Sequence, residues 1–289
     1  MADVITGTQL VTSKADLISS VVQKELAFNS MLVPTIEDVS KFAVKGAKTI
    51  SFPKLTSFTV VNRAEGVAGD ASALTSSVDQ LALSTNAFVA WILDSFTLAQ
   101  ISFEAKLEFA KRAAQAQSRF VDTSIITKLA SIAFEFLNVG ADVDATYANM
   151  VAMDQRLREK NADPSMISII ASPKQHGVLM GLDEFKRADV YGSANIPKGT
   201  VGFIMGHPVY IHNNLAQKQL FMYEKGACAI GFQKGASYGE ESALAYGVGA
   251  MKQAVDQIFG LSGLQLGVDS GIGTAVGATK TGLCIGLND

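Results

Sequence analysis

The sequence has few charged residues, few cysteines and no excess of basic residues. Charged side chains make up 18% of its 289 residues, whereas an average soluble protein has about 25%. The net charge of -3 argues against a dedicated nucleic-acid reader, because such proteins carry a strong basic excess. Two cysteines, Cys228 and Cys284, are too few for a disulfide framework. We expect them to be buried free thiols in a reducing compartment rather than one bridge.

Long hydrophobic runs and catalytic motifs are also missing. The uncharged stretch 80–93 contains polar residues and is shorter than the roughly 20 residues of a membrane span. No basic segment precedes an apolar one at the start, so we expect no signal peptide. His207 and His212 have an odd spacing, which places them on opposite faces of an expected strand. Residues 271–277 match a dinucleotide fingerprint poorly and lack its βαβ unit. We therefore predict no catalytic, cofactor-binding or metal-binding residues.

The apolar content is high for a chain of this length. Hydrophobic residues make up 48% of the sequence, and the mean hydropathy is +0.24. These values exclude a disordered chain, which buries too little apolar surface to fold. They also indicate that part of the apolar surface is buried against other chains.

The first third of the sequence predicts an arm and a long hairpin. A short helix is expected from Ser13, ended by Pro34, and its narrow apolar stripe should pack on another element. A strand is expected over 44–53, continuing at 58–61, with a single returning strand over 81–93. Residues 63–78 form a polar tip. Because a two-stranded hairpin is barely stable alone, we expect it to lie across a neighbouring chain or to be a surface loop.

Residues 97–138 contain neither glycine nor proline and predict one long helix. At 1.5 Å per residue it would span roughly 60 Å, with a break near Arg119 as an alternative. Its apolar residues follow two helical stripes, which are Leu98, Ile101, Ala105, Phe109, Ala113, Ala116 and Phe120, then Val121, Ile125, Leu129, Ile132 and Phe136. Between residues 105 and 134 its acids are Glu108 and Asp122, and they are outnumbered by five basic residues, Lys106, Lys111, Arg112, Arg119 and Lys128. This excess indicates either a solvated face or a mild attraction for a polyanion.

The remaining sequence predicts a mixed α/β or α+β unit. A helix over 144–160 is stopped by Pro164, a buried strand follows over 166–171, and Ser172-Pro173 begins another helix. Short strands are expected over 200–205, 208–212, 220–223 and 227–232. Fourteen of the 25 glycines lie from Gly226 onward, so helix is unfavourable over most of the tail.

The order of these elements, together with three segments, resembles one family. The segments are Lys45–Pro53, Ile169–Pro173 with Leu179, and Gly202–Tyr210 with Asn213 and Asn214. They resemble the major capsid protein of tailed double-stranded DNA bacteriophages, which has the HK97-like fold. The resemblance implies an α+β chain with an N-terminal arm at 1–46 and an extended β-hairpin loop at 47–94. It also implies a peripheral domain with a spine helix at 95–150 and 240–265, and a mixed axial domain at 151–239 and 266–289.

By this resemblance the chain is not an enzyme and assembles with copies of itself. Hexamers and pentamers would form an icosahedral shell in the virion, built in the host cytoplasm around non-specifically contacted DNA, with no membrane partner. No lysine lies between Lys54 and Lys106, so a covalent cross-link from the loop tip is excluded. About 46 residues precede the loop, so we expect the scaffold to be a separate protein. The resemblance also implies separate portal and decoration proteins. The alternatives are an encapsulin-type nanocompartment shell and, with less support, an α/β enzyme.

Overall fold

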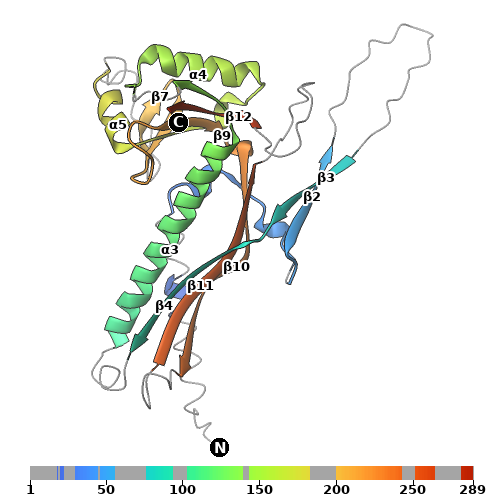
Figure 1. Cartoon of the computed structure of the whole chain (residues 1–289), viewed down its shortest axis with the longest axis vertical. Coiled ribbons are helices and arrows are strands. Elements are labelled where there is room, and N and C mark those ends of the chain that lie inside the picture. The colour runs from blue at the N-terminus through green and yellow to red at the C-terminus, as the bar shows by residue number, and fades with distance from the viewer. Residues whose placement is uncertain are drawn as a thin grey trace, which may run out of the picture.

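The computed structural model describes residues 18, 20–22, 30–44, 46–55, 76–93, 103–138, 143–182, 200–242, 251–263 and 281–288. The described chain forms a long helix and a long sheet side by side, a mixed α/β unit at one end, and a two-stranded ribbon that projects sideways (Figure 1). Within these residues, no helix is long and apolar enough to cross a membrane.

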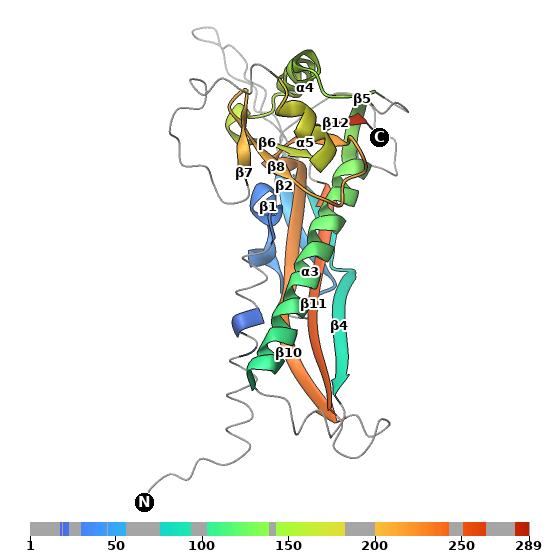
Figure 2. The same cartoon turned by 90° about the vertical axis from the view of Figure 1, so that its left-hand side faces the viewer.

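The long sheet has the strand order β1-β10-β11-β4. Its strands are β1 (Glu37–Asp38), β10 (Cys228–Ser242), β11 (Met251–Gly263) and β4 (Thr85–Leu93). β10, β11 and β4 run antiparallel to their neighbours, and β1 runs parallel to β10. Helix α3 follows the length of this sheet and covers one face of it (Figure 2). The described parts of the glycine-rich tail after Ala227 are therefore strands, in agreement with the prediction that helix is unfavourable there.

Helix α3 (Phe103–Ile132) has 30 residues and spans about 45 Å. It runs unbroken through Arg119, and its buried residues include Val121, Ile125 and Leu129, as predicted. The first predicted stripe is wrong in part, because Phe109 and Phe120 are 41% and 47% exposed. The small residues Ala110, Ala113 and Ala114 face the sheet instead, and they let the helix approach it closely.

The predicted helix also extended too far at its C-terminal end, because residues Ala133–Asn138 form strand β5. This strand pairs in parallel with β12 (Thr281–Asn288), and the Phe136 ring packs edge-on against Phe221. The absence of glycine and proline permits a helix but does not require one. Pairing with a strand almost 150 residues later decides the conformation. Residues 97–102 of the predicted helix lie outside the described residues.

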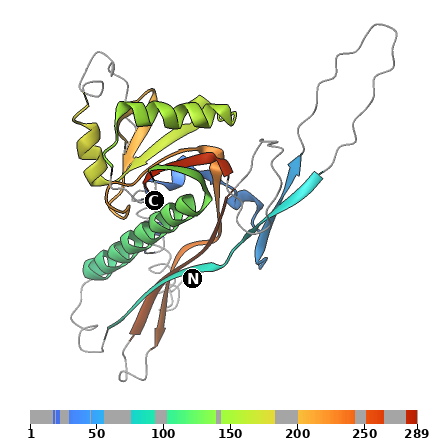
Figure 3. The same cartoon turned by 45° about the horizontal axis from the view of Figure 1, so that its top comes forward.

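The mixed unit contains a six-stranded sheet with the order β5-β12-β9-β6-β8-β7. The strands not yet given are β9 (Leu220–Glu224), β6 (Ile167–Ala171), β8 (His207–Ile211) and β7 (Thr200–Ile204). Helix α4 (Tyr147–Glu159) lies on the side of the sheet away from α3 (Figure 3). Helix α5 (Pro173–Leu179) follows β6, and its N-terminus is capped by Ser172. The predicted helices of this unit and its strands β6, β7, β8 and β9 are confirmed, apart from small shifts of their ends. The strand predicted here over 227–232 is instead β10, which is much longer and belongs to the long sheet.

The ribbon consists of β2 (Thr49–Leu55) and β3 (Ser76–Ala82), paired antiparallel. The prediction of a single returning strand is wrong, because the chain leaves the ribbon after Ala82 and joins the long sheet as β4. β4 finds an open edge on β11 there, which provides nine paired residues. The predicted strand at 58–61 and most of the polar tip lie outside the described residues.

The chain before the ribbon packs along the body. Ile18 and Val22 belong to a buried cluster with the small residues of α3, while residues 13–17, 19 and 23–29 of the predicted first helix lie outside the described part. Residues 30–44, which we call the strap, contain the short 3-10 turns Val33–Thr35 and Ser40–Phe42. Further 3-10 turns lie at Pro164–Met166 and Lys225–Ala227.

Candidate functional site

The ribbon is anchored in a notch formed by two glycines. Gly231 and Gly260 lie directly opposite each other on β10 and β11, and Ile50 and Leu81 lie opposite each other on the ribbon. A Cβ on Gly231 would lie 2.6 Å from Ile50 Cδ1, and a Cβ on Gly260 would overlap the Ala82 carbonyl oxygen. Only glycine permits this approach. The notch therefore fixes where the base of the ribbon leaves the body.

Burial at the notch supports this role. Ile50 and Leu81 are 1% and 0% exposed, and they form a cluster with Val39 of the strap and Ala229 of β10. The cluster is separate from the main core, which lies between α3, α4 and the six-stranded sheet. The ribbon is thus held by a few apolar side chains at its base, while the rest of it extends away from the body (Figure 1).

One face of β4 is open and partly apolar. Phe88 and Ile92 are 54% and 40% exposed, whereas Ala87 and Leu93 on the other face are buried. Across the strand pair, Lys252 lies opposite Ile92, and its Nζ is 5.5 Å from the centre of the Phe88 ring. Exposed aromatic and aliphatic side chains on a sheet face are typical of a surface that contacts another chain.

The strap connects the parts of the body. Its β1 residues pair with β10, and the Phe232 backbone N–H donates to Ser40 Oγ at 2.9 Å. Near its middle, Thr35 hydrogen-bonds the hydroxyl of Tyr223 in the six-stranded sheet. Burial raises the pKa of this tyrosine, so the phenol is neutral and its hydroxyl hydrogen takes part in the contact.

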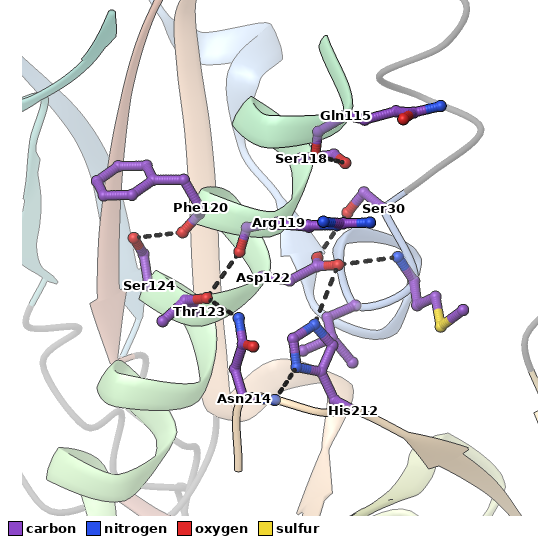
Figure 4. Close-up of polar contacts among 12 residues, drawn as sticks. Ser30, Gln115, Ser118, Arg119, Phe120, Asp122, Thr123, Ser124, His212 and Asn214 are labelled. Atoms are coloured by element: carbon purple, nitrogen blue, oxygen red, sulfur yellow. Dashed lines mark hydrogen bonds and ion pairs between the residues drawn. The ribbon is translucent and has the colours of Figure 1, made fainter. Parts of the chain in front are cut away.

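The start of the strap is held by a buried carboxylate on α3. Asp122 is 2% exposed; it accepts hydrogen bonds from Ser30 Oγ at 2.8 Å and from the Met31 backbone N–H at 3.3 Å. His212 Nε2, at the end of β8, lies 3.6 Å from the same carboxylate (Figure 4). Three segments far apart in the sequence therefore meet at one side chain.

The proton position on His212 follows from its other contact. The Asn214 backbone N–H donates to His212 Nδ1 at 3.2 Å, so the neutral ring carries its hydrogen on Nε2, which faces Asp122. Asn214 Nδ2 also donates to Thr123 Oγ1 on α3. These contacts bind the loop after β8 to the middle of α3.

A cavity of about 530 Å³ opens beside this cluster, between the strap, α3 and the loop after β8. Its polar walls come from Gln115, Ser118, Arg119 and Asn213, and Met31 contributes an apolar rim. The Arg119 side chain lies above Asp122 in Figure 4. The volume is within the range of about 300–1,000 Å³ that is usual for ligand sites.

The residues singled out in the sequence lie in different places. Among the basic residues of α3, Arg112 pairs with Glu108 at 3.3 Å, while Arg119 lines the cavity. His207 and His212 contact different carboxylates, Asp154 at 3.1 Å and Asp122 at 3.6 Å. In the part of the chain that the structure describes, no group of three histidine, cysteine or acidic side chains is placed to hold a metal ion.

Sequence reasoning missed Asp122 as a structural residue. It counted this acid with the exposed charges of the helix, although its spacing of three and seven residues from Ile125 and Leu129 places it on the buried face. The prediction that both thiols are buried and free is confirmed for Cys228 and Cys284. Burial raises the pKa of the Cys228 thiol to about 12 and raises that of Cys284 as well.

The sequence matches no protein-family model and no curated protein. The fold, however, is shared with solved structures of virus shells. The chain superposes on the capsid of cyanophage P-SCSP1u with a TM-score of 0.64 and 11% identity, covering 88% of this chain and 86% of that one. It matches the mature capsid of bacteriophage PhiM1 with a TM-score of 0.61 and 13% identity, covering 90% and 87%.

A third similar structure is a virus-like particle from Pyrococcus furiosus, with a TM-score of 0.60, 9% identity and coverage of 94% of this chain and 98% of that one. The architecture is therefore the α+β architecture that these shell proteins share. The chain has the HK97-like capsid fold, as the resemblance predicted. At these identities the likeness shows the fold alone.

Proposed function

We propose that this chain is the major capsid subunit of a tailed bacteriophage and that it acts by self-assembly, without catalytic turnover. The observation that carries the proposal is a fold shared with phage capsids over most of the chain, combined with apolar surface that the subunit itself leaves open. The ribbon and the open face of β4 are the surfaces that we assign to contacts between copies.

Physical reasoning supports this assignment. The ribbon has two strands and a narrow apolar base, and an isolated two-stranded hairpin is only marginally stable in water. A neighbouring copy would cover it and gain interface area. Obligate interfaces of about 2,000–5,000 Å² are apolar, which agrees with the low charge content of 18% and the exposed Phe88 and Ile92.

The details of the assembly are also part of what we propose, and they come from the resemblance to tailed-phage capsid proteins. Copies would form hexamers and pentamers of an icosahedral shell in the virion, assembled in the host cytoplasm around double-stranded DNA. Scaffolding, portal and decoration functions would come from separate proteins. The shell would depend on non-covalent contacts, because no lysine lies between Lys54 and Lys106. The domain boundaries at 46, 94 and 150 remain predictions.

Sedimentation and negative-stain microscopy of the purified full chain test the proposal. We expect closed particles of uniform size. Deleting residues 63–75, between the two strands of the ribbon, should leave a folded subunit that assembles poorly. A well-dispersed monomer of the wild-type chain at micromolar concentration would refute the shell function, and normal particles from the deletion variant would refute the role of the ribbon.

A nanocompartment shell of the encapsulin type is the second candidate. The coverage of 94% and 98% against the Pyrococcus furiosus particle favours it, since little of either chain is left unmatched. The contents of purified particles separate the two functions. Nuclease-protected DNA after expression with a packaging system supports the capsid, whereas a co-purifying enzyme held inside the particle supports the nanocompartment.

A further inference from the structure

The cavity at the junction of the strap, α3 and the loop after β8 is lined by one basic side chain that forms no ion pair within the described chain. Asp122 also lines the cavity, and its buried carboxylate accepts from Ser30 and Met31 and faces His212 rather than forming an ion pair with an arginine. Arg119 lies one helical turn before Asp122 and is exposed. Across the described ranges of the chain, no carboxylate forms an ion pair with Arg119.

The other polar groups around Arg119 are neutral. Gln115 and Asn213 are uncharged amides that can donate, and Ser118 is a hydroxyl. Both ring nitrogens of His212 are occupied by Asp122 and by the Asn214 backbone. A guanidinium without an ion-pair partner is suited to an oxyanion, because it can donate two parallel hydrogen bonds to one carboxylate or phosphate.

The shape of the cavity favours an acidic side chain over a DNA backbone as its occupant. A hollow of about 530 Å³ admits an extended acidic side chain with part of its own backbone. A duplex presents its phosphates on a convex surface and would reach only the rim. Met31, 44% exposed at that rim, adds an apolar contact of the kind found in protein interfaces. The sequence also has more acidic than basic residues, 27 against 24, so copies of this chain can supply the carboxylate.

We propose that this cavity receives an aspartate or glutamate side chain of a second copy of the chain, with Arg119 as its ion-pair partner. The inference rests on the proposed shell function and deepens it by naming a specific intersubunit contact. Because the strap, α3 and the loop after β8 all line the cavity, an occupant would touch three segments whose mutual positions Asp122 fixes.

Cross-linking within assembled particles tests the contact. Arg119→Lys retains the charge and provides an amine that a water-soluble carbodiimide joins to a carboxylate in contact with it. Particles are assembled from equal amounts of isotopically light and heavy subunits, cross-linked and digested. We expect position 119 to be joined to an acidic residue of the other isotope form in about half of the linked peptides, as random mixing requires.

A matched control comes from the same helix. Arg112 is also exposed but already pairs with Glu108 in its own copy, so Arg112→Lys should give links within one copy only. Arg119→Gln should raise the concentration needed for half-maximal assembly by about fivefold, which is typical of a partly exposed ion pair. Its far-ultraviolet circular dichroism spectrum should not change.

The outcomes separate this contact from the shell function. Normal wild-type particles in which position 119 links only within its own copy, or not at all, would overturn the contact and leave the shell function in place. Loss of packaged DNA with unchanged assembly in Arg119→Gln would assign the arginine to nucleic acid and also overturn it. Failure of the wild-type chain to form particles would refute both.

Discussion

The glycine notch makes the position of the ribbon sensitive to a single methyl group. In Gly260→Ala, the new Cβ would overlap the carbonyl oxygen of Ala82 and lie 2.8 Å from Leu81 Cδ2. Nonbonded heavy atoms rest at about 3.5 Å, so the base of the ribbon must move by roughly 1 Å. The clash is with backbone as well as with a side chain, and backbone cannot rotate out of the way.

The expected cost is that of overpacking a tightly packed site, about 1–3 kcal/mol of unfolding free energy. Part of the strain should be relieved by a tilt of the ribbon. A strand of seven residues is about 23 Å long, so a small change at its base is amplified at its far end. We therefore expect assembly to suffer more than folding does.

Two measurements with one control examine this reasoning. Urea unfolding of the unassembled subunit gives the change in stability, and sedimentation gives the fraction in particles. Gly239→Ala is the matched control, because Gly239 lies on β10, is exposed, and has no neighbouring atom within 4 Å of the position that a Cβ would take. It should change stability by less than about 0.5 kcal/mol and assemble normally. If Gly260→Ala behaves like this control in both assays, the notch does not position the ribbon.

Three further predictions concern the body of the subunit. Asp122→Ala should lower the unfolding free energy by about 1–3 kcal/mol, since the partly buried Ser30 hydroxyl and the His212 ring N–H lose their acceptor. Exchange of the Met31 amide hydrogen should also speed up. Ser124→Ala removes a hydroxyl of the same helix whose hydrogen bond is exposed, and it should do neither. Burial raises the pKa of Cys228 from 9.0 to about 12. The folded state therefore gains the full contribution of the neutral thiol below pH 9 and loses it as the pH rises towards 12. The urea midpoints at pH 8 and pH 11 should differ less in Cys228→Ala than in the wild-type protein. Gly286→Ala should lower the Tm, because its Cβ would overlap a phenylalanine ring of β5.

For each of these three predictions, one specific result would contradict the reasoning. An unchanged exchange rate at the start of the strap in the Asp122 variant would show that the carboxylate does not hold it. Equal pH dependence in the wild-type and Cys228 proteins would assign the alkaline loss to other groups. An unaltered melting temperature in the Gly286 variant would mean that the sheet relaxes without cost.

Sequence reasoning succeeded where local signals were strong. The cap at Ser172 with Pro173 in the first turn, the buried strand 167–171 and the long helix across Arg119 are confirmed. These features depend on side chains within a few residues of one another, so a single segment contains the information. The α+β class and the HK97-like fold were predicted from the order of such segments.

The failures share a different cause. Ala133–Asn138 became a strand because β12 pairs with it, and Thr85–Leu93 joined the body because β11 offered an edge. Asp122 became a buried anchor because Ser30 and His212 reach it from segments about 90 residues away on either side. None of these partners is visible within the segment concerned.

The sequence by itself determined the general character of this protein: an apolar, weakly charged chain with a long helix, a glycine-rich tail in which helix is unfavourable, and no catalytic motif. Only the tertiary structure decided that Gly231 and Gly260 face each other under the ribbon. It also decided that Arg119 lines a cavity beside Asp122, whose carboxylate accepts hydrogen bonds from the strap. The physical reason is the range of the forces involved. Helix and strand preferences act between near neighbours in the chain, whereas close approach and charge pairing depend on which distant segments meet.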